Sequence, residues 1–314
     1  MTDNVMLSVI LTVFNHENYL ARALSSILEQ ETNFTYEIVI GDDASDDSSA
    51  SVIADFAGRF PEIVVPIYRR TNIGGSRNFT DLFRRCRGQY ITFIDGDDYW
   101  IDQRKLQIQY DFLEHHPDVF AVAHKVKVCD ADGALINIVP RGPFKNDRIT
   151  IKDFLMGNRF PLTSTMMRAL RGQELDDFLD RVEIGARNAG DTTICLFLLD
   201  KGPIPILKSA MTVYRYRSTV GHGNYNSITK LHERLRDRIQ LLRINDNYFG
   251  GKYCFSWLYI RLAAGATRGL IAGNASNIKA LVLLIINSAL LSWKTAFSYF
   301  WAKLKNISES STPG

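Results

Sequence analysis

The sequence has few cysteines, little net charge and no uncharged apolar run long enough to cross a membrane. Its four cysteines form no CxxC pair, which excludes a zinc knuckle or a disulfide framework and indicates reduced thiols in a cytosolic protein. A net charge of +3 is too small to indicate a nucleic-acid partner. The main charge-free apolar run, residues 280–293, is too short to span a bilayer of about 30 Å as a helix. No basic leader with a cleavage site precedes the first apolar run.

What the chain does have is an ordinary globular composition with an uneven distribution of charge. Of its 314 residues, 46% are apolar and 23% are charged, which excludes collagen-like and wholly disordered chains. Residues 228–314 contain 12 Lys and Arg against 4 Asp and Glu, whereas the first 227 residues contain 25 against 30. We therefore expect the two parts to meet different partners.

Strand and helix patterns alternate along the first part. Buried-strand runs occur at 5–14, 36–40, 63–68, 89–94 and 119–128, and helical spacing occurs at 19–30, 48–60, 78–86 and 105–115. This order predicts an α/β fold with a doubly wound, mainly parallel sheet over 1–227. Residues 130–150 are predicted to be a loop. The remainder, 228–314, is predicted to be an α-helical extension with helices at 228–245, 253–271 and 277–305 and a disordered tail.

Acidic residues follow two of the predicted strands. Asp42 and Asp43 end the second strand, and Asp95-Gly96-Asp97-Asp98 ends the fourth. Ligands of open α/β sheets bind beyond the carboxyl ends of the strands, so these acids indicate a site. Two carboxylates with this spacing suit a divalent cation, Mn²⁺ or Mg²⁺, that clamps a diphosphate. An acidic turn without a metal, and an Asp43 that only caps a turn or helix, remain the alternatives.

Four motifs in this order carry a family resemblance. They are residues 9–15 (VILTVFN), 42–46 (DDASD), 72–74 (NIG) and 88–100 (GQYITFIDGDDYW). Together they resemble the inverting family-2 glycosyltransferases of bacterial cell-surface polysaccharide assembly, which have the GT-A fold. The resemblance is close over about residues 5–115 and looser up to about residue 222. It implies a nucleotide-sugar half, 1–115, and an acceptor half, 116–227. It implies a Rossmann-like nucleotide-binding sheet.

The resemblance implies roles for six matched positions. Thr12 and Phe14 match positions that frame the nucleotide, and Asp43 matches the acid that reads uracil. Asp95 matches the acid that holds the ribose, and Asp97 the acid that holds the metal and diphosphate. Arg77 lies near a position that contacts the base. Two departures are visible, because the family's usual glycine is Ala44 here and its usual tyrosine is Phe14. A solvated side chain remains the alternative for Arg77.

The acceptor half offers a general base. Gly190-Asp191-Thr192 precedes an apolar helix and resembles the family's acidic motif, so Asp191 is predicted to take the proton of the acceptor hydroxyl. A helix N-cap is the alternative role. Further acceptor or diphosphate candidates are Asp98, Trp100, Arg217, which replaces the family's usual histidine, and His222. Two alternatives remain open: Trp100 could be a core residue, and His222 could lie in a loop and bind no ligand.

The sequence therefore predicts a metal-assisted hexosyl- or N-acetylhexosaminyl-transferase. It would move a sugar from a UDP-sugar to a glycan or lipid-linked glycan. The basic, tryptophan-containing segment 228–305 suits an anionic membrane surface, which predicts a peripheral position on the inner face of the cytoplasmic membrane. A hairpin packed on the domain and a homo-oligomer interface are alternatives for that segment. A non-catalytic scaffold and a sugar nucleotidyltransferase are the rival functions, although residues 9–16 lack the glycines and lysines of a nucleotidyltransferase loop.

Overall fold

The protein is described here by a computed structural model. The structure describes residues 5–155, 157–185, 190–216 and 249. The chain divides into two units, Met1–Ser227 and Ile228–Gly314, and every element named below belongs to the first. The helices predicted at 228–245, 253–271 and 277–305, the expected disordered tail, and the candidates Arg217 and His222 lie outside the described residues.

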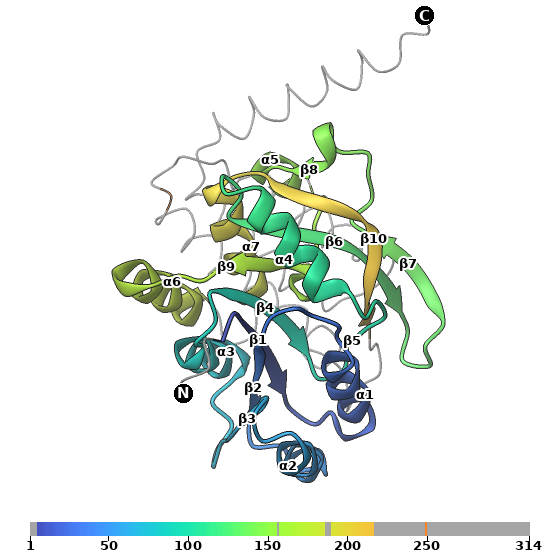
Figure 1. Ribbon diagram of the computed structural model, residues 1–314, viewed down its shortest axis with the longest axis vertical. Coiled ribbons are helices and arrows are strands. Elements are labelled where there is room, and N and C mark those ends of the chain that lie inside the picture. The colour runs from blue at the N-terminus through green and yellow to red at the C-terminus, as the bar shows by residue number, and fades with distance from the viewer. Residues whose placement is uncertain (1–4, 156, 186–189, 217–248, 250–314) are drawn as a thin grey trace, which may run out of the picture. The chain divides into compact units, whose positions relative to one another are not determined.

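The nucleotide-sugar half is a parallel sheet with helices between its strands (Figure 1). Its elements are β1 (Leu7–Val13), α1 (Glu17–Leu28), β2 (Tyr36–Asp42), α2 (Ser49–Arg59), β3 (Val64–Tyr68), α3 (Gly75–Arg85) and β4 (Tyr90–Asp95). The strands lie in the order β3-β2-β1-β4, and each pairs in parallel with its neighbour. The predicted strands and helices of this half are confirmed, with shifts of up to three residues at their ends.

The acceptor half extends the same sheet with mixed strand directions. Two elements at the end of the first half, β5 (Tyr99–Trp100) and α4 (Lys105–His115), lead into it. Its own elements are β6 (Ala121–Cys129), β7 (Leu135–Val139), β8 (Arg148–Ile149), α5 (Ile151–Leu155), β9 (Met166–Arg168), α6 (Gly172–Gly185), α7 (Gly190–Lys201) and β10 (Ile204–Arg215), with short 3₁₀ turns at Lys145–Asp147 and Leu162–Ser164. The order continues β4-β9-β6-β10-β5. Strand β9 runs antiparallel to both β4 and β6, whereas β10 runs parallel to β6.

The predicted loop over 130–150 is wrong. Strand β7 forms an antiparallel hairpin with β6, and β8 pairs with the start of β10. Glycine and proline at both ends of β7 made this segment read as a loop. The strand also lacks a buried apolar run, because Leu135, Ile136 and Ile138 are all exposed. A strand that faces solvent on much of its surface gives no burial signal in the sequence.

Apolar side chains explain why these strands and helices pack. Residues from β1, β2 and β4 form one buried cluster with the inner face of α1, which contributes Leu20, Leu24 and Ile27. These three recur at intervals of three and four residues, so they share one face of the helix. Full burial of each such side chain stabilises the fold by about 1.5–3 kcal/mol. This packing holds the strand ends rigidly at one edge of the sheet.

A buried lysine lies between α4 and the sheet. Helix α4 packs on β6 (Figure 1), and Lys105 at its start is fully buried. The Lys105 Nζ donates to Gln109 Oε1 at 2.8 Å and to Thr92 Oγ1 at 3.3 Å, and it lies 4.2 Å from the centre of the Trp100 ring. Burial lowers the pKa of Lys105 to about 7. The amine is thus partly neutral near physiological pH in the folded protein.

This buried amine predicts a pH dependence of stability. Above pH 7 the unfolded chain, with an ordinary lysine pKa of about 10.4, binds more protons at this site than the folded chain. The free energy of unfolding should therefore rise with pH in the wild type relative to Lys105→Met, by up to about 1.4 kcal/mol per pH unit. Urea unfolding at pH 7, 8 and 9 measures this difference. The exposed Lys152→Met is the control, and a difference that stays constant with pH would contradict the prediction.

Candidate active site

The ends of β1 and β4 bring two predicted nucleotide residues together. Thr12 and Asp95 are register partners in the parallel pair, and the Thr12 hydroxyl donates a hydrogen bond to Asp95 Oδ1. Asp95 is exposed, and Phe14, just beyond the end of β1, is 45% exposed. These groups therefore line an open edge of the sheet, where a nucleotide has access to them.

Asp43 joins the second and third motifs. Its carboxylate accepts hydrogen bonds from the backbone N–H groups of Ile73 at 2.8 Å and Gly74 at 2.9 Å, and the Asn72 side chain donates to its carbonyl at 3.1 Å. Burial raises the pKa of Asp43, and the two backbone hydrogen bonds oppose that rise. Each carboxylate oxygen has two lone pairs, so the group still has capacity to accept from a base. The Asn72–Gly74 segment is therefore fixed by Asp43.

The turn after Asp43 explains the family's preference for glycine. Ala44 has φ +58°, a conformation that costs a non-glycine residue about 1–2 kcal/mol. The turn is held on both sides, because the Ser45 hydroxyl donates to Asp42 and accepts from the Asn15 backbone N–H at 3.0 Å. The chain thus keeps the glycine-type geometry despite the alanine, and it ties the end of β1 to the end of β2.

The acidic turn after β4 concentrates negative charge. Asp97 is 8% exposed and Asp98 is 1% exposed. Burial, and then the neighbouring Asp97 and Asp95, raise the pKa of Asp98 well above its usual range. Gly96 is required by close packing, since a Cβ at this position would lie 2.7 Å from His16 Nδ1. The turn therefore presents its acids at a fixed position beside the first residues of α1.

The donor chemistry of this turn fits a shared cation site. Within the part of the chain that the structure describes, no three His, Cys, Asp or Glu side chains form a complete metal cluster. Mg²⁺, whose preferred ligands Mn²⁺ shares, is usually held by one or two carboxylates together with substrate phosphates. Asp95 and Asp97 are two such carboxylates on one turn. The residues present fit a cation that a diphosphate helps to bind.

Asp191 lies in the first turn of α7. It is exposed, yet the protein around it desolvates the carboxylate and raises its pKa, against smaller opposing effects of its own backbone N–H and of Arg159. A Cβ at Gly190 would lie 3.4 Å from Ser76 Oγ, so α7 begins beside the start of α3. The acceptor half therefore places Asp191 next to the segment that Asp43 fixes.

Tyr214 connects the two acidic groups. Burial first, and then the charges of Asp98, Asp191, Asp97 and Asp95, raise the pKa of its phenol far above the usual value. The side chain on β10 thus senses both the acidic turn and Asp191.

The contacts of three other predicted site residues do not indicate a role in ligand binding. Arg77 is exposed on the first turn of α3, and its charge helps to lower the pKa of Glu183 on α6. Trp100 is 4% exposed beneath Lys105, an environment typical of a core residue. Asp98 is interior, and its Oδ1 accepts a hydrogen bond from the Arg215 backbone N–H at 2.9 Å. Their roles toward a ligand stay predictions.

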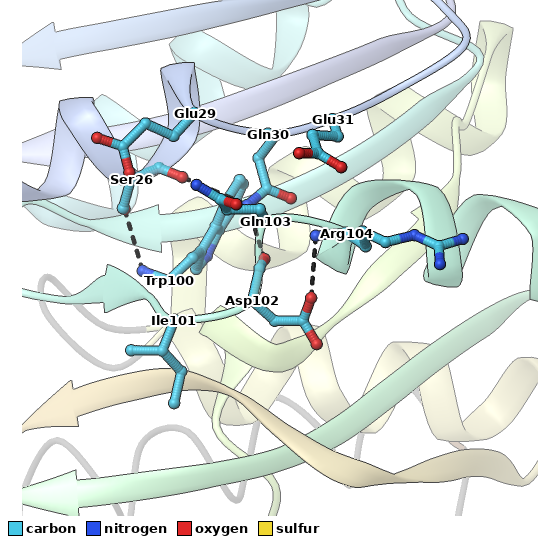
Figure 2. Close-up of a pocket in the computed structure, with 9 residues that line it drawn as sticks. All are labelled: Ser26, Glu29, Gln30, Glu31, Trp100, Ile101, Asp102, Gln103 and Arg104. Atoms are coloured by element: carbon cyan, nitrogen blue, oxygen red, sulfur yellow. Dashed lines mark hydrogen bonds between the residues drawn. The ribbon is translucent and has the colours of Figure 1, made fainter.

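The pocket in Figure 2 lies elsewhere. Its volume is about 490 Å³, and it is formed by the end of α1, by β5 and by the turn that precedes α4. Figure 2 shows the backbone N–H of Trp100 donating to Ser26 Oγ at 3.0 Å, and that of Arg104 donating to Asp102 Oδ1 at 2.9 Å. Trp100 is the only predicted site residue among its lining residues. The polar groups here chiefly close the fold behind the sheet.

Sequence reasoning missed Tyr214 and Arg215. The signal was present in Tyr214-Arg215-Tyr216, where β10 ends in an arginine between two tyrosines. Attention to Arg217, at the family's histidine position, obscured Arg215. His124, in contrast, is a buried structural residue: burial lowers its pKa to about 3, and its ring lies 3.3 Å from Thr212 Oγ1.

A parallel α/β sheet with acids at its strand ends, continued by strands of mixed direction, is typical of the GT-A class of fold. The chain belongs to glycosyl transferase family 2, whose model matches residues 8–170. The predicted family and fold class are thus confirmed.

A relative in Mycobacterium tuberculosis is an uncharacterized protein, 32% identical over 226 residues. The match covers 70% of this chain and 61% of the mycobacterial protein, so the chain spans less than two thirds of that relative.

Two solved structures share the fold. Staphylococcus aureus TarS in complex with UDP is similar with a TM-score of 0.54 and 17% identity, over 77% of this chain and 66% of that one. A mannosyltransferase from Pyrobaculum calidifontis, in complex with GDP-Man and Mn²⁺, is similar with a TM-score of 0.52 and 16% identity, over 92% of this chain and 87% of that one. Across the described residues, no helix has the length and apolarity needed to cross a membrane.

Proposed function

We propose that this protein is an inverting glycosyltransferase that moves a hexosyl or N-acetylhexosaminyl group from a UDP-sugar to a glycan or lipid-linked glycan hydroxyl. The observation that carries this proposal is the geometry of the sheet edge, where the Thr12 hydroxyl donates to Asp95 Oδ1 and Asp43 holds the backbone of Ile73 and Gly74, in a chain of glycosyl transferase family 2. In this proposal Asp191 supplies the base on the acceptor side. The complexes of TarS with UDP and UDP-GlcNAc support a nucleotide-sugar donor, as does the GDP-Man complex of the mannosyltransferase.

The proposed roles follow from position. Thr12, Phe14 and Asp43 bind the nucleoside, and Asp95 holds the ribose at the edge where Thr12 orients its carboxylate. Asp97 would hold a divalent cation, Mn²⁺ or Mg²⁺, which when bound neutralises charge on the diphosphate leaving group. The Mn²⁺ in the mannosyltransferase complex supports this assignment.

Asp191 acts on the acceptor side. As the acceptor hydroxyl attacks the anomeric carbon from the face opposite the diphosphate, its proton passes to the Asp191 carboxylate. The new C–O bond forms while the bond to the diphosphate breaks, so the anomeric configuration inverts. Asp191 is exposed, which leaves room for an acceptor sugar to reach it.

A nucleotide panel tests the donor. Thermal unfolding of the full chain with Mn²⁺ should show a higher Tm with UDP than with GDP, ADP or CDP. Binding at 100 times the dissociation constant stabilises the folded state by about 2.7 kcal/mol. A Tm unaffected by UDP would overturn the UDP assignment. Release of UDP with and without glycan acceptors then separates a transferase from a non-catalytic scaffold, which releases none.

The proposed setting is polysaccharide biosynthesis at the inner face of the cytoplasmic membrane. The support is compositional: basic residues alternate with tryptophans and leucines in 228–305, which favours anionic lipid surfaces. Homo-oligomerisation through the same segment is the alternative. Sedimentation with anionic vesicles, compared with the oligomeric state in solution, distinguishes the two.

A further inference from the structure

Arg215 is a buried arginine at the end of β10, and the function proposed above gives it no role. It is only 7% exposed. Among the residues that the structure describes, its guanidinium pairs with no carboxylate, although three acids lie on the neighbouring turn. Its side chain instead donates to backbone carbonyl groups from two separate segments.

The first segment is the acidic turn. Arg215 Nε donates to the carbonyl of Asp97 at 3.3 Å, and the Arg215 backbone N–H donates to Asp98 Oδ1 at 2.9 Å. The residue thus holds this turn by its backbone and by its side chain at once. Each of these contacts joins residues that are more than one hundred positions apart in the sequence.

The second segment is the turn between β6 and β7. Arg215 Nη1 donates to the carbonyl of Ala131 at 2.9 Å and, more weakly, to that of Asp130 at 3.4 Å. The Tyr19 ring of α1 covers the guanidinium, with its centre 4.6 Å from Cζ. The planar guanidinium therefore bridges the acidic turn to the hairpin, in a geometry that the point charge of a lysine cannot reproduce.

We propose that Arg215 is a positioning residue that fixes the acidic turn Asp95–Asp98 in the conformation that binds the divalent cation and the donor diphosphate. The inference rests on the proposed function. Arg215 acts through the main chain of Asp97, whose side chain is the predicted metal ligand. Its guanidinium binds the turn through a backbone carbonyl, so this contact does not use the Asp97 carboxylate.

The structure offers a matched control in Arg168 on β9. This arginine also donates to backbone carbonyls, those of Leu113 at 2.6 Å and Val119 at 3.1 Å, and stacks near an aromatic ring, that of Tyr90. Its side-chain hydrogen-bond partners within the described part of the chain, Tyr90, Leu113, His116 and Val119, all lie outside the acidic turn. Arg168→Met and Arg215→Met should therefore lower stability to similar extents, while only the second alters the site.

The experiment measures ligand binding by the full chain. In Arg215→Met, the Kd for UDP in the presence of Mn²⁺ should rise about 10–100-fold, the usual effect of removing a group that orients a metal ligand. Arg168→Met should leave that Kd within about twofold. Uridine, which lacks phosphates, should lose much less affinity in Arg215→Met than UDP with Mn²⁺ does, because Asp43 and Phe14 are untouched and only Asp95 of the nucleoside site belongs to the turn. Arg168→Met should bind uridine as the wild type does. Arg215→Lys should remain close to Arg215→Met.

The outcomes separate the two proposals. A wild type that binds neither UDP nor UDP with Mn²⁺ contradicts the proposed function. A wild type that binds, with unchanged Mn²⁺-dependent affinity in Arg215→Met or in Arg215→Lys, overturns the positioning role. A loss of uridine affinity in Arg215→Met as large as its loss of Mn²⁺-dependent UDP affinity also overturns it, because the defect would then be a general disruption of the nucleoside site.

Discussion

Replacement of Asp191 by asparagine should lower kcat for sugar transfer about 10²–10⁴-fold, the usual contribution of a general base. Asparagine keeps the size of the side chain and can still cap α7, but it cannot accept a proton from the acceptor hydroxyl. If capping were the main role of Asp191, the variant would retain most of its activity. The substitution therefore separates the two roles that the sequence left open. Initial rates with donor and acceptor at saturation measure kcat.

The pH profile gives an independent readout. The general base works only when ionised, so wild-type activity should fall as the pH drops through the pKa of Asp191. That pKa is raised by desolvation, and the acidic limb should therefore lie above the range of an ordinary carboxylate. Asp191→Asn should lose this limb while its Kd for UDP remains close to that of the wild type.

An exposed acid on a neighbouring helix provides the control. Asp176→Asn on α6 removes the same charge from a solvent-facing position, and it should keep wild-type kcat and the same pH profile. Wild-type turnover in Asp191→Asn would remove this residue from the mechanism. Equal losses in the two variants would indicate a general charge effect.

The nucleotide-sugar half could be predicted because its signals are local. The strands are short apolar runs that end in acids, and parallel pairing alone brings Thr12 and Asp95 to the same edge. Asp43 required one more step, since its backbone partners Ile73 and Gly74 lie 30 and 31 residues away. The order of the motifs suggested that they meet, but not that Asp43 fixes the loop.

The acceptor half was harder to predict because its contacts are long-range and its strands are less buried. Strand β7 exposes its aliphatic side chains, so its sequence carries neither a buried run nor a clean alternation. The Trp100 ring packs against the amine of Lys105, at the start of α4. Sequence alone does not predict this contact, because lysine is seldom fully buried. The bridge made by Arg215 depends on a hairpin that was read as a loop, so no local pattern pointed to it.

Replacement of Asp97 by asparagine should weaken metal-dependent UDP binding and transfer about 10²–10³-fold. The reason is that a bound cation contributes several kcal/mol to stabilising charge on the diphosphate, and a neutral amide is a poorer ligand for it. Calorimetric titration of UDP at increasing Mn²⁺ concentrations measures the change. The exposed Asp118→Asn should behave as the wild type.

The comparison with Arg215→Met makes this test specific, because the two substitutions affect different groups of Asp97. One changes its side-chain carboxylate, and the other removes the hydrogen bond to its backbone carbonyl. Asp97→Asn removes the carboxylate but keeps the Asp97 carbonyl that accepts from Arg215 Nε, so the turn should stay in place. Arg215→Met keeps the carboxylate but releases the turn. High Mn²⁺ should therefore recover much of the UDP affinity in Arg215→Met, where the ligand is still present, and little of it in Asp97→Asn. Undiminished metal-dependent binding in Asp97→Asn would contradict the assignment of the cation to this turn.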